Sequence, residues 1–215
     1  MKLTTKLSII RSTFTAALAA VLCALSLISL PAAGGRSVSL QHMGAVFAGL
    51  LAGGAQGAGS VGIFLLAGMF GLPVFPGRTG GMEALLAATG GFTAGYFLSA
   101  LAAGLCAGSP RLQERRFSAV QWLRTAAGAV LGFAASWLPG ICWYIRCMEA
   151  EGRAVSAAAA WQEQVQPSLP GEIPLLIAAV PLAAVLRPAA ARLLYPDDDK
   201  EADELLASLS KKRKG

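Results

Sequence analysis

The sequence contains few charged residues. Only 14% of its 215 residues are Asp, Glu, Lys or Arg, whereas about 25% is usual in a soluble domain, and 55% are hydrophobic. This shortage of charge argues against a protein whose whole surface faces water. The 42 alanines and 25 glycines point the same way, because small side chains let helices approach closely inside a bilayer. The composition therefore predicts a membrane protein.

Motifs for catalysis and metal binding are also missing. There is no GxxxxGK[ST] phosphate loop, so the chain is not expected to hydrolyse ATP by the usual arrangement, and there is no HExxH, GxSxG or pair of intramembrane carboxylates. The single histidine, His42, begins a predicted helix and is interpreted as a packed residue rather than a ligand. The cysteines form no CxxC pair; they are Cys23, Cys106, Cys142 and Cys147. We predict no enzyme activity, cofactor or metal site.

A net charge of +6 does not indicate a nucleic-acid partner here. A nucleic-acid-binding protein carries its Lys and Arg on one folded basic face. In this chain they lie between apolar runs and at the two ends. The expected surroundings are a lipid bilayer, in the cell (inner) membrane.

Charge-free stretches predict six membrane crossings, since one crossing needs about 20 apolar helical residues. A turn is expected in the segment GGAQGAGS, Gly53 to Ser60, and the last crossing has to accommodate Pro174 and Pro181. The predicted helices are about Ile9 to Leu30 (stopped by Pro31), Gln41 to Leu51, Val61 to Leu72, one within Ala84 to Pro110, one within Thr125 to Ile145, and one between Glu172 and Arg187. The predicted fold class is an all-α bundle of six transmembrane helices.

The distribution of positive charge predicts the orientation. Six crossings place both termini on one side, and that side has 14 Lys and Arg residues against four on the other. Both termini are therefore expected to be cytoplasmic. A cleaved signal peptide at the start is the alternative, but the first apolar run exceeds the usual core of 7–15 residues. Residues 1–196 form the expected membrane domain, and residues 197–215 a charged cytoplasmic tail.

Two segments stand out as candidate sites. GLPVFPGRTGG, Gly71 to Gly81, has prolines and glycines in otherwise apolar sequence, and irregular backbone near membrane depth needs protein or a water-filled cavity around it. TGG follows at Thr89 to Gly91, where the glycines open space for a close neighbour. A tight hairpin with close helix packing is an equally good interpretation of this region.

Three further residues are candidates near the predicted outer ends of helices. Glu172 begins the last crossing, where a carboxylate suits the helix dipole and also suits a functional site beside a cavity. Trp143 and Arg146 are three residues apart and share a helix face, and a Trp at this depth is often an interface anchor. On the first helix, alanines at intervals of four form a smooth ridge for another helix: Ala16, Ala20 and Ala24.

Four motifs are distinctive when taken together: SLQ at Ser39 to Gln41, GLPVFPGRTGG, TGGFTAGY at Thr89 to Tyr96, and LPGE at Leu169 to Glu172. With them the chain resembles a known family, the BioY-type biotin-specific S components of energy-coupling factor (ECF) transporters. The resemblance implies a six-helix bundle that binds biotin from the outside. It also implies docking of the alanine ridge on a transmembrane coupling subunit (T), which carries two ATP-binding subunits (A).

The resemblance also implies a set of substrate-binding residues. Two places depart from the family pattern: Ala87 and Ala88 precede Thr89 where GPTGG is usual, and Glu172 and Leu175 stand where an Asp and a Lys are usual. With no Lys at 175, Arg78 or Arg146 is expected to pair with the ligand carboxylate. A related substrate such as dethiobiotin, or a packing protein without a ligand, are the alternatives. The implied set is Gln41, Phe75, Arg78, Thr79, Thr89, Gly90, Gly91, Trp143, Arg146 and Glu172.

Overall fold

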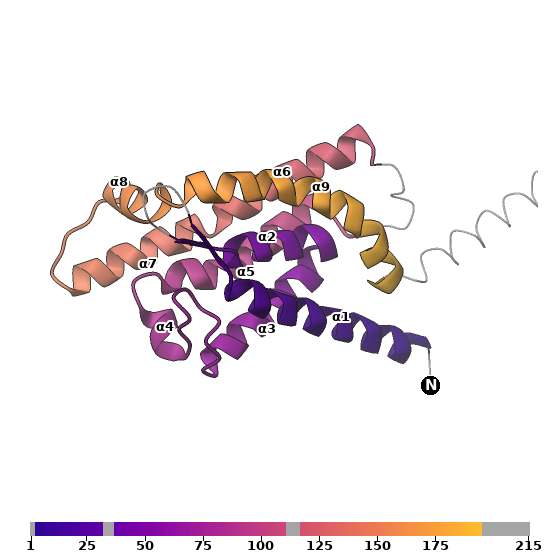
Figure 1. Ribbon diagram of the computed structural model, residues 1–215, viewed down its shortest axis with the longest axis horizontal. Helices are drawn as coiled ribbons and strands as arrows, with labels where there is room; N and C mark the ends of the chain where they lie inside the picture. The colour runs from indigo at the N-terminus through magenta and orange to yellow at the C-terminus, as the bar shows by residue number, and fades with distance from the viewer. Residues whose placement is uncertain (1–2, 32–36, 111–116, 195–215) are drawn as a thin grey trace, which may run out of the picture.

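The computed structural model describes residues 3–31, 37–110 and 117–194, and these are almost entirely helical. Figure 1 shows α1, α6, α7 and α9 running along the long axis of the molecule. The helices are α1 (Leu3–Ser26), α2 (Gln41–Ala52), α3 (Gly54–Met69), α4 (Met82–Leu86), α5 (Gly90–Ala107), α6 (Ala119–Ala135), α7 (Trp137–Ala150), α8 (Ala157–Ala160), a π-helical turn η1 (Trp161–Val165) and α9 (Leu169–Leu194). The prediction of a helical protein is confirmed. The predicted tail, 197–215, lies outside the described residues.

A small antiparallel ribbon was not predicted. Strand β1 (Ser29–Pro31) pairs with β2 (Ser37–Ser39), so α1 ends at Ser26 and not at Leu30. Pro31 is thus the last residue of a strand rather than the stop signal of the helix. Proline is tolerated at such a strand end because its missing N–H is not needed by the ladder there.

Helix α2 lies at the centre of the bundle. Every residue of it except Phe47 is buried, and it packs against α1, α3, α5, α6 and α9. With 12 residues it is about 18 Å long at 1.5 Å per residue, which is shorter than a bilayer core. The surrounding helices therefore shield α2 from lipid.

The predicted turn between the second and third helices is wrong. Helix α3 begins at Gly54, so most of GGAQGAGS is helical and only Gly53, with φ +84°, makes the connection. The glycines serve close packing instead: a β-carbon on Gly57 would lie 2.6 Å from Gly49 Cα. Glycine in a helix interior costs about 1 kcal/mol of helix propensity, and here the close approach of α2 and α3 requires it.

The predicted fifth helix is two helices in the structure. Helix α6 ends at Ala135, Ser136 interrupts it, and α7 begins at Trp137. Pro139 lacks the N–H that would bond to the carbonyl of Ala135, which accounts for the break. Together, residues Ala119–Ala150 make one long apolar segment, longer at both ends than the predicted helix within Thr125 to Ile145.

Helix α9 runs unbroken through three prolines. It extends from Leu169 to Leu194 and contains Pro174, Pro181 and Pro188, so it is longer than the predicted span. The prolines are seven residues apart and share one face, because seven residues make nearly two helical turns. Pro174 and Pro181 are exposed, so the irregular face of α9 points away from the bundle.

Four helical segments of the described chain are long and apolar enough to cross a membrane. They are Ser8–Ser26, Gly90–Ala107, Ala119–Ala150 and Leu169–Leu194. Helices α2 and α3 are apolar but shorter. These segments bear out the prediction of a membrane protein.

A buried arginine joins three parts of the bundle. Arg187 of α9 is 1% exposed and donates hydrogen bonds to the carbonyls of Leu50 (2.6 Å), Ala107 (3.2 Å), Gly108 (3.0 Å) and Ser109 (3.2 Å). The last carbonyls of a helix have no partner within it. Arg187 therefore satisfies the C-terminal ends of both α2 and α5 with a positive charge that also suits their dipoles.

Replacement of Arg187 tests this arrangement. Arg187→Leu should destabilise the protein by at least about 3 kcal/mol, because several buried carbonyls lose a charged donor. For a chain of this size that corresponds to a melting midpoint lower by roughly 6–12 °C, measured in detergent by circular dichroism. Arg192→Leu, on the exposed side of the same helix, is the matched control and should change the midpoint little. Equal midpoints for the two variants would contradict the assignment.

Candidate functional site

A cavity of about 250 Å³ lies between the helices of the bundle. It lies among the first turns of α2, α5 and α9, the junction of α6 with α7, and the segment after α8. The residues around it are His42, Pro76, Thr89, Phe92, Thr93, Tyr96, Ser136, Trp137, Gln164, Val165, Pro167, Ser168 and Glu172. Its mixture of aromatic walls with a few polar groups is typical of a small-molecule site.

Burial changes from one end of the cavity to the other. The polar floor is buried and consists of His42, Thr93, Tyr96, Ser136 and Glu172. At the mouth, Pro76 and Thr89 are exposed and Gln164 is half-buried. A ligand would therefore place one end in a dry polar floor and leave the other end near water.

His42 is held on all sides. Its ring stacks on Tyr96, at 5.3 Å between ring centroids, and on Phe133, at 5.0 Å. Its Nδ1 lies 3.4 Å from Glu172 Oε2, and its Nε2 lies 3.0 Å from Ser136 Oγ. These contacts fix the imidazole between α2, α9 and the α6–α7 junction.

Glu172 is a buried carboxylate in the first turn of α9, where the helix dipole favours it. Its Oε2 faces His42 and also accepts a hydrogen bond of 3.4 Å from Ser168 Oγ. The described residues give Oε1 no hydrogen bond. One carboxylate oxygen is thus held by the protein, and the other is available to accept from a ligand N–H.

A polar network ties the segment after α8 to α7. Tyr144 donates a 2.6 Å hydrogen bond to Glu163 Oε2, and Arg153 pairs with the other oxygen of Glu163. The Tyr144 hydroxyl, together with the Arg153 charge, lowers the pKa of the Glu163 carboxyl, which lies outside the long helices. The network holds Gln164 and Val165 beside the cavity.

Thr89 and Glu172 are the two residues of the predicted set that lie in the cavity wall. Gly90 and Gly91 lie directly behind Thr89 and let α5 begin against its neighbours. A β-carbon on Gly91 would collide with Trp143, and one on Gly90 with the carbonyl of Leu85. Trp143 lies outside the lining and donates a 3.0 Å hydrogen bond from its indole to the carbonyl of Ala87.

The loop between α3 and α4 is a tight hairpin, one of the two interpretations left open above. Phe75 is 1% exposed and packs edge-on against Phe64, with ring centroids 6.1 Å apart. Its backbone pairs with Thr79, whose side chain is exposed and donates to the carbonyl of Pro76 at 3.0 Å. Arg78 forms the exposed tip, with φ +59°. Of this loop, Pro76 contributes to the cavity wall.

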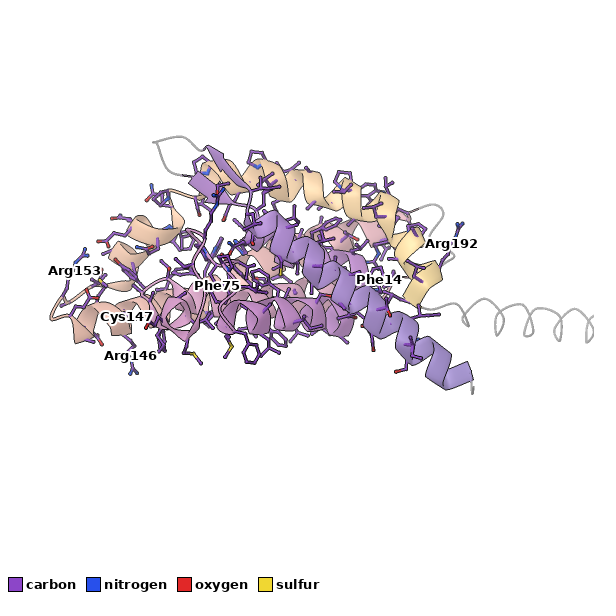
Figure 2. The ribbon with its side chains drawn as sticks, turned by 60° about the horizontal axis from the view of Figure 1, so that its bottom comes forward. Phe14, Phe75, Arg146, Cys147, Arg153 and Arg192 are labelled. Atoms are coloured by element: carbon purple, nitrogen blue, oxygen red, sulfur yellow. The ribbon has the colours of Figure 1, made fainter. Side chains whose placement is uncertain are left out.

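The other predicted residues lie outside the lining. Arg146 is exposed, and Figure 2 shows it pointing away from the molecule. Gln41 is buried and donates from Nε2 to the carbonyl of Ser26 at 3.5 Å, joining α2 to the end of α1. Leu175 packs in the apolar core. A direct role in ligand binding for Arg78, Arg146 or Gln41 stays a prediction.

Comparison with known proteins identifies the chain. The model of the BioY family matches residues 1–192. The chain belongs to the BioY family. Among the curated proteins, none matches this BioY chain in sequence.

A solved structure has the same fold as this BioY protein. It is described as the crystal structure of the S-component for biotin from an ECF-type ABC transporter. The two share 22% sequence identity over 87% of this chain and 94% of the other, with a TM-score of 0.67. The similarity shows that the helices are arranged in the same way.

Several cavity residues of this BioY protein were missed by sequence analysis. His42 was interpreted as a packed residue, and it is packed, but it also faces the cavity and contacts Glu172. Tyr96, Ser136 and Trp137 were not singled out because aromatic and hydroxyl residues in apolar helices are usually structural. The segment of residues 164–168 gave no signal at all, and only its position against α9 brings it to the cavity.

Proposed function

We propose that this BioY protein is the substrate-binding (S) subunit of an ECF-type vitamin transporter, which captures biotin on the outer side of the cell membrane. Uptake then requires a transmembrane coupling subunit and two ATP-binding subunits, which supply the ATP hydrolysis that this chain has no motif for. The observation that carries the proposal is the buried pair of His42 and Glu172 at the floor of a ligand-sized cavity in a BioY chain.

The floor of the cavity suits a ureido ring. A ureido group has two N–H donors and a carbonyl acceptor, and Glu172 Oε1 is placed to accept from one N–H while the hydroxyls of Ser136 and Thr93 are within the same floor. The walls of Phe92, Trp137 and Val165 are largely apolar and suit a ring system with an aliphatic chain. A dry floor strengthens such hydrogen bonds and makes any unpaired polar group costly, which gives selectivity.

Biotin titration of the detergent-purified protein, by calorimetry and by tryptophan fluorescence, tests the proposal. We expect tight, saturable binding, with Trp137 reporting from the cavity wall. Glu172→Ala should weaken binding roughly 10- to 100-fold, because a charge-assisted hydrogen bond contributes about 1.5–3 kcal/mol.

Glu149→Ala, at the exposed outer part of α7, is the matched control and should bind as the unaltered protein does. If the protein binds dethiobiotin but not biotin, its substrate is dethiobiotin, a change that the departures from the family pattern at residues 172 and 175 allow. Failure of both ligands to bind would contradict the proposal.

The arrangement of the described ends supports six crossings with both termini cytoplasmic. The start of α1 and the end of α9 lie at the same end of the bundle (Figure 1), and Arg11 Nε donates a 2.7 Å hydrogen bond to the carbonyl of Leu194. The cavity lies at the opposite end, which places it outside under this topology. Figure 2 shows Arg146 and Arg153 at one end and Arg192 at the other.

Cysteine labelling checks this topology. In a variant whose native cysteines are replaced by alanine, Glu151→Cys should react with a membrane-impermeant maleimide added to intact cells, because Glu151 lies in an exposed turn after α7. Arg192→Cys, at the other end of the bundle, should react only after the cells are permeabilised. Labelling of both, or of neither, in intact cells would contradict an even number of crossings with the cavity outside.

The alanine ridge of α1 is the proposed contact with the coupling subunit. Ala16, Ala20 and Ala24 are all exposed, on the side of α1 away from α2 and α3, whereas Leu18 and Leu22 face the core. A smooth exposed ridge lets a second helix approach closely, where packing contacts drive association within lipid.

Ala20→Leu tests the docking surface. It should reduce copurification of the coupling subunit by about tenfold or more, since overpacking one contact costs about 1–3 kcal/mol. Biotin binding by the isolated variant should be unchanged because α1 contributes nothing to the described cavity wall. Ala178→Leu, on the exposed side of α9, is the matched control and should copurify normally. Normal copurification of Ala20→Leu would exclude the ridge.

A further inference from the structure

The charge at the floor of the cavity limits which end of a ligand can lie there. Glu172 is an acidic residue with 8% exposure, and the lining residues within the described chain include no Lys or Arg. His42 is the one lining residue of that set that can carry a positive charge, and both its nitrogens already face protein groups, Glu172 and Ser136. Tyr96 and Phe133 both stack on its ring.

A ligand carboxylate at this floor would be unfavourable for two reasons. It would lose its hydration in a buried site without a cationic partner, and it would lie close to the like charge of Glu172. A ureido head group has the opposite chemistry, because its N–H groups are donors for Glu172. The floor therefore orients biotin with its ureido ring inward and its carboxylate toward the mouth.

Within residues 3–31, 37–110 and 117–194, the mouth leaves a carboxylate near water and offers it no cationic lining group. The described groups that frame it are neutral: Pro76, Thr89 and Gln164. Beyond the lining, Arg78 is at the exposed tip of its hairpin, Arg146 points away from the molecule, and Arg153 pairs with Glu163. A carboxylate at the mouth keeps its hydration, so its charge contributes little to affinity.

We propose, building on the proposed function, that this cavity recognises the ureido end of biotin and not its carboxylate. Neutral derivatives at that carboxylate, such as esters and N-alkyl amides, then bind about as tightly as biotin. The S component accordingly accepts a wider substrate class than free biotin, which includes biotin joined through its carboxyl group to an amine.

Calorimetric titration of the full-length detergent-purified protein with biotin, biotin methyl ester and biotin N-methylamide tests this inference. We expect the three dissociation constants to agree within about threefold, a difference of about 0.7 kcal/mol or less. The affinity for biotin should also stay constant between low and high salt, since no exposed ion pair contributes. Glu172→Gln should weaken all three ligands by the same factor, because each presents the same ureido group to residue 172.

The outcomes separate this inference from the proposed function. Tight binding of biotin with ester and amide binding weaker by 30-fold or more would overturn the inference alone, because it would show that a cation pairs with the carboxylate. A steep loss of biotin affinity with salt would lead to the same conclusion. Failure of all three ligands to bind would overturn the proposed function and the inference with it.

Discussion

The structure depends on how the ends of α2 are satisfied. This helix runs through the middle of the bundle, shielded from both water and lipid, so its polar groups have to find partners within the protein. Helix α9 supplies a partner at each end: Glu172 faces His42 in the first turn, and Arg187 donates to the carbonyl of Leu50 in the last. The same two charged residues that α9 brings into an apolar bundle therefore fix the register of the two helices and one wall of the cavity.

The cavity forms where large rings line the space between tightly packed helices. Close contacts in the bundle rely on glycine: β-carbons on Gly49 and Gly104 would collide with the backbones of α5 and α3, respectively. Such contacts also occur beside the cavity, where a β-carbon on Gly91 would collide with Trp143. The rings of Tyr96 and Trp137 line the cavity itself, so the pocket combines large side chains with close glycine contacts next to it.

The helices and part of the site were predictable because their signals are local. Charge-free runs of about 20 residues favour transmembrane helices, and the TGG and LPGE motifs pointed to Thr89 and Glu172, which both line the cavity. The GGAQGAGS segment was misread because glycine marks turns and close helix contacts alike, and only the neighbouring Gly49 decides between them. The role of His42 could not be predicted because its partner lies 130 residues later, on a helix whose position depends on the whole fold.

The glycine contacts have a consequence for how this gene can vary. Glycine is the smallest residue, so every coding change at Gly57, Gly91 or Gly104 adds atoms to a place where a single β-carbon already meets backbone or a ring. At a lipid-facing position such as Val185 or Leu138, by contrast, one apolar side chain can replace another with little effect on packing. Substitution is therefore poorly tolerated at these residues without a side chain, and better tolerated on the exposed apolar surface.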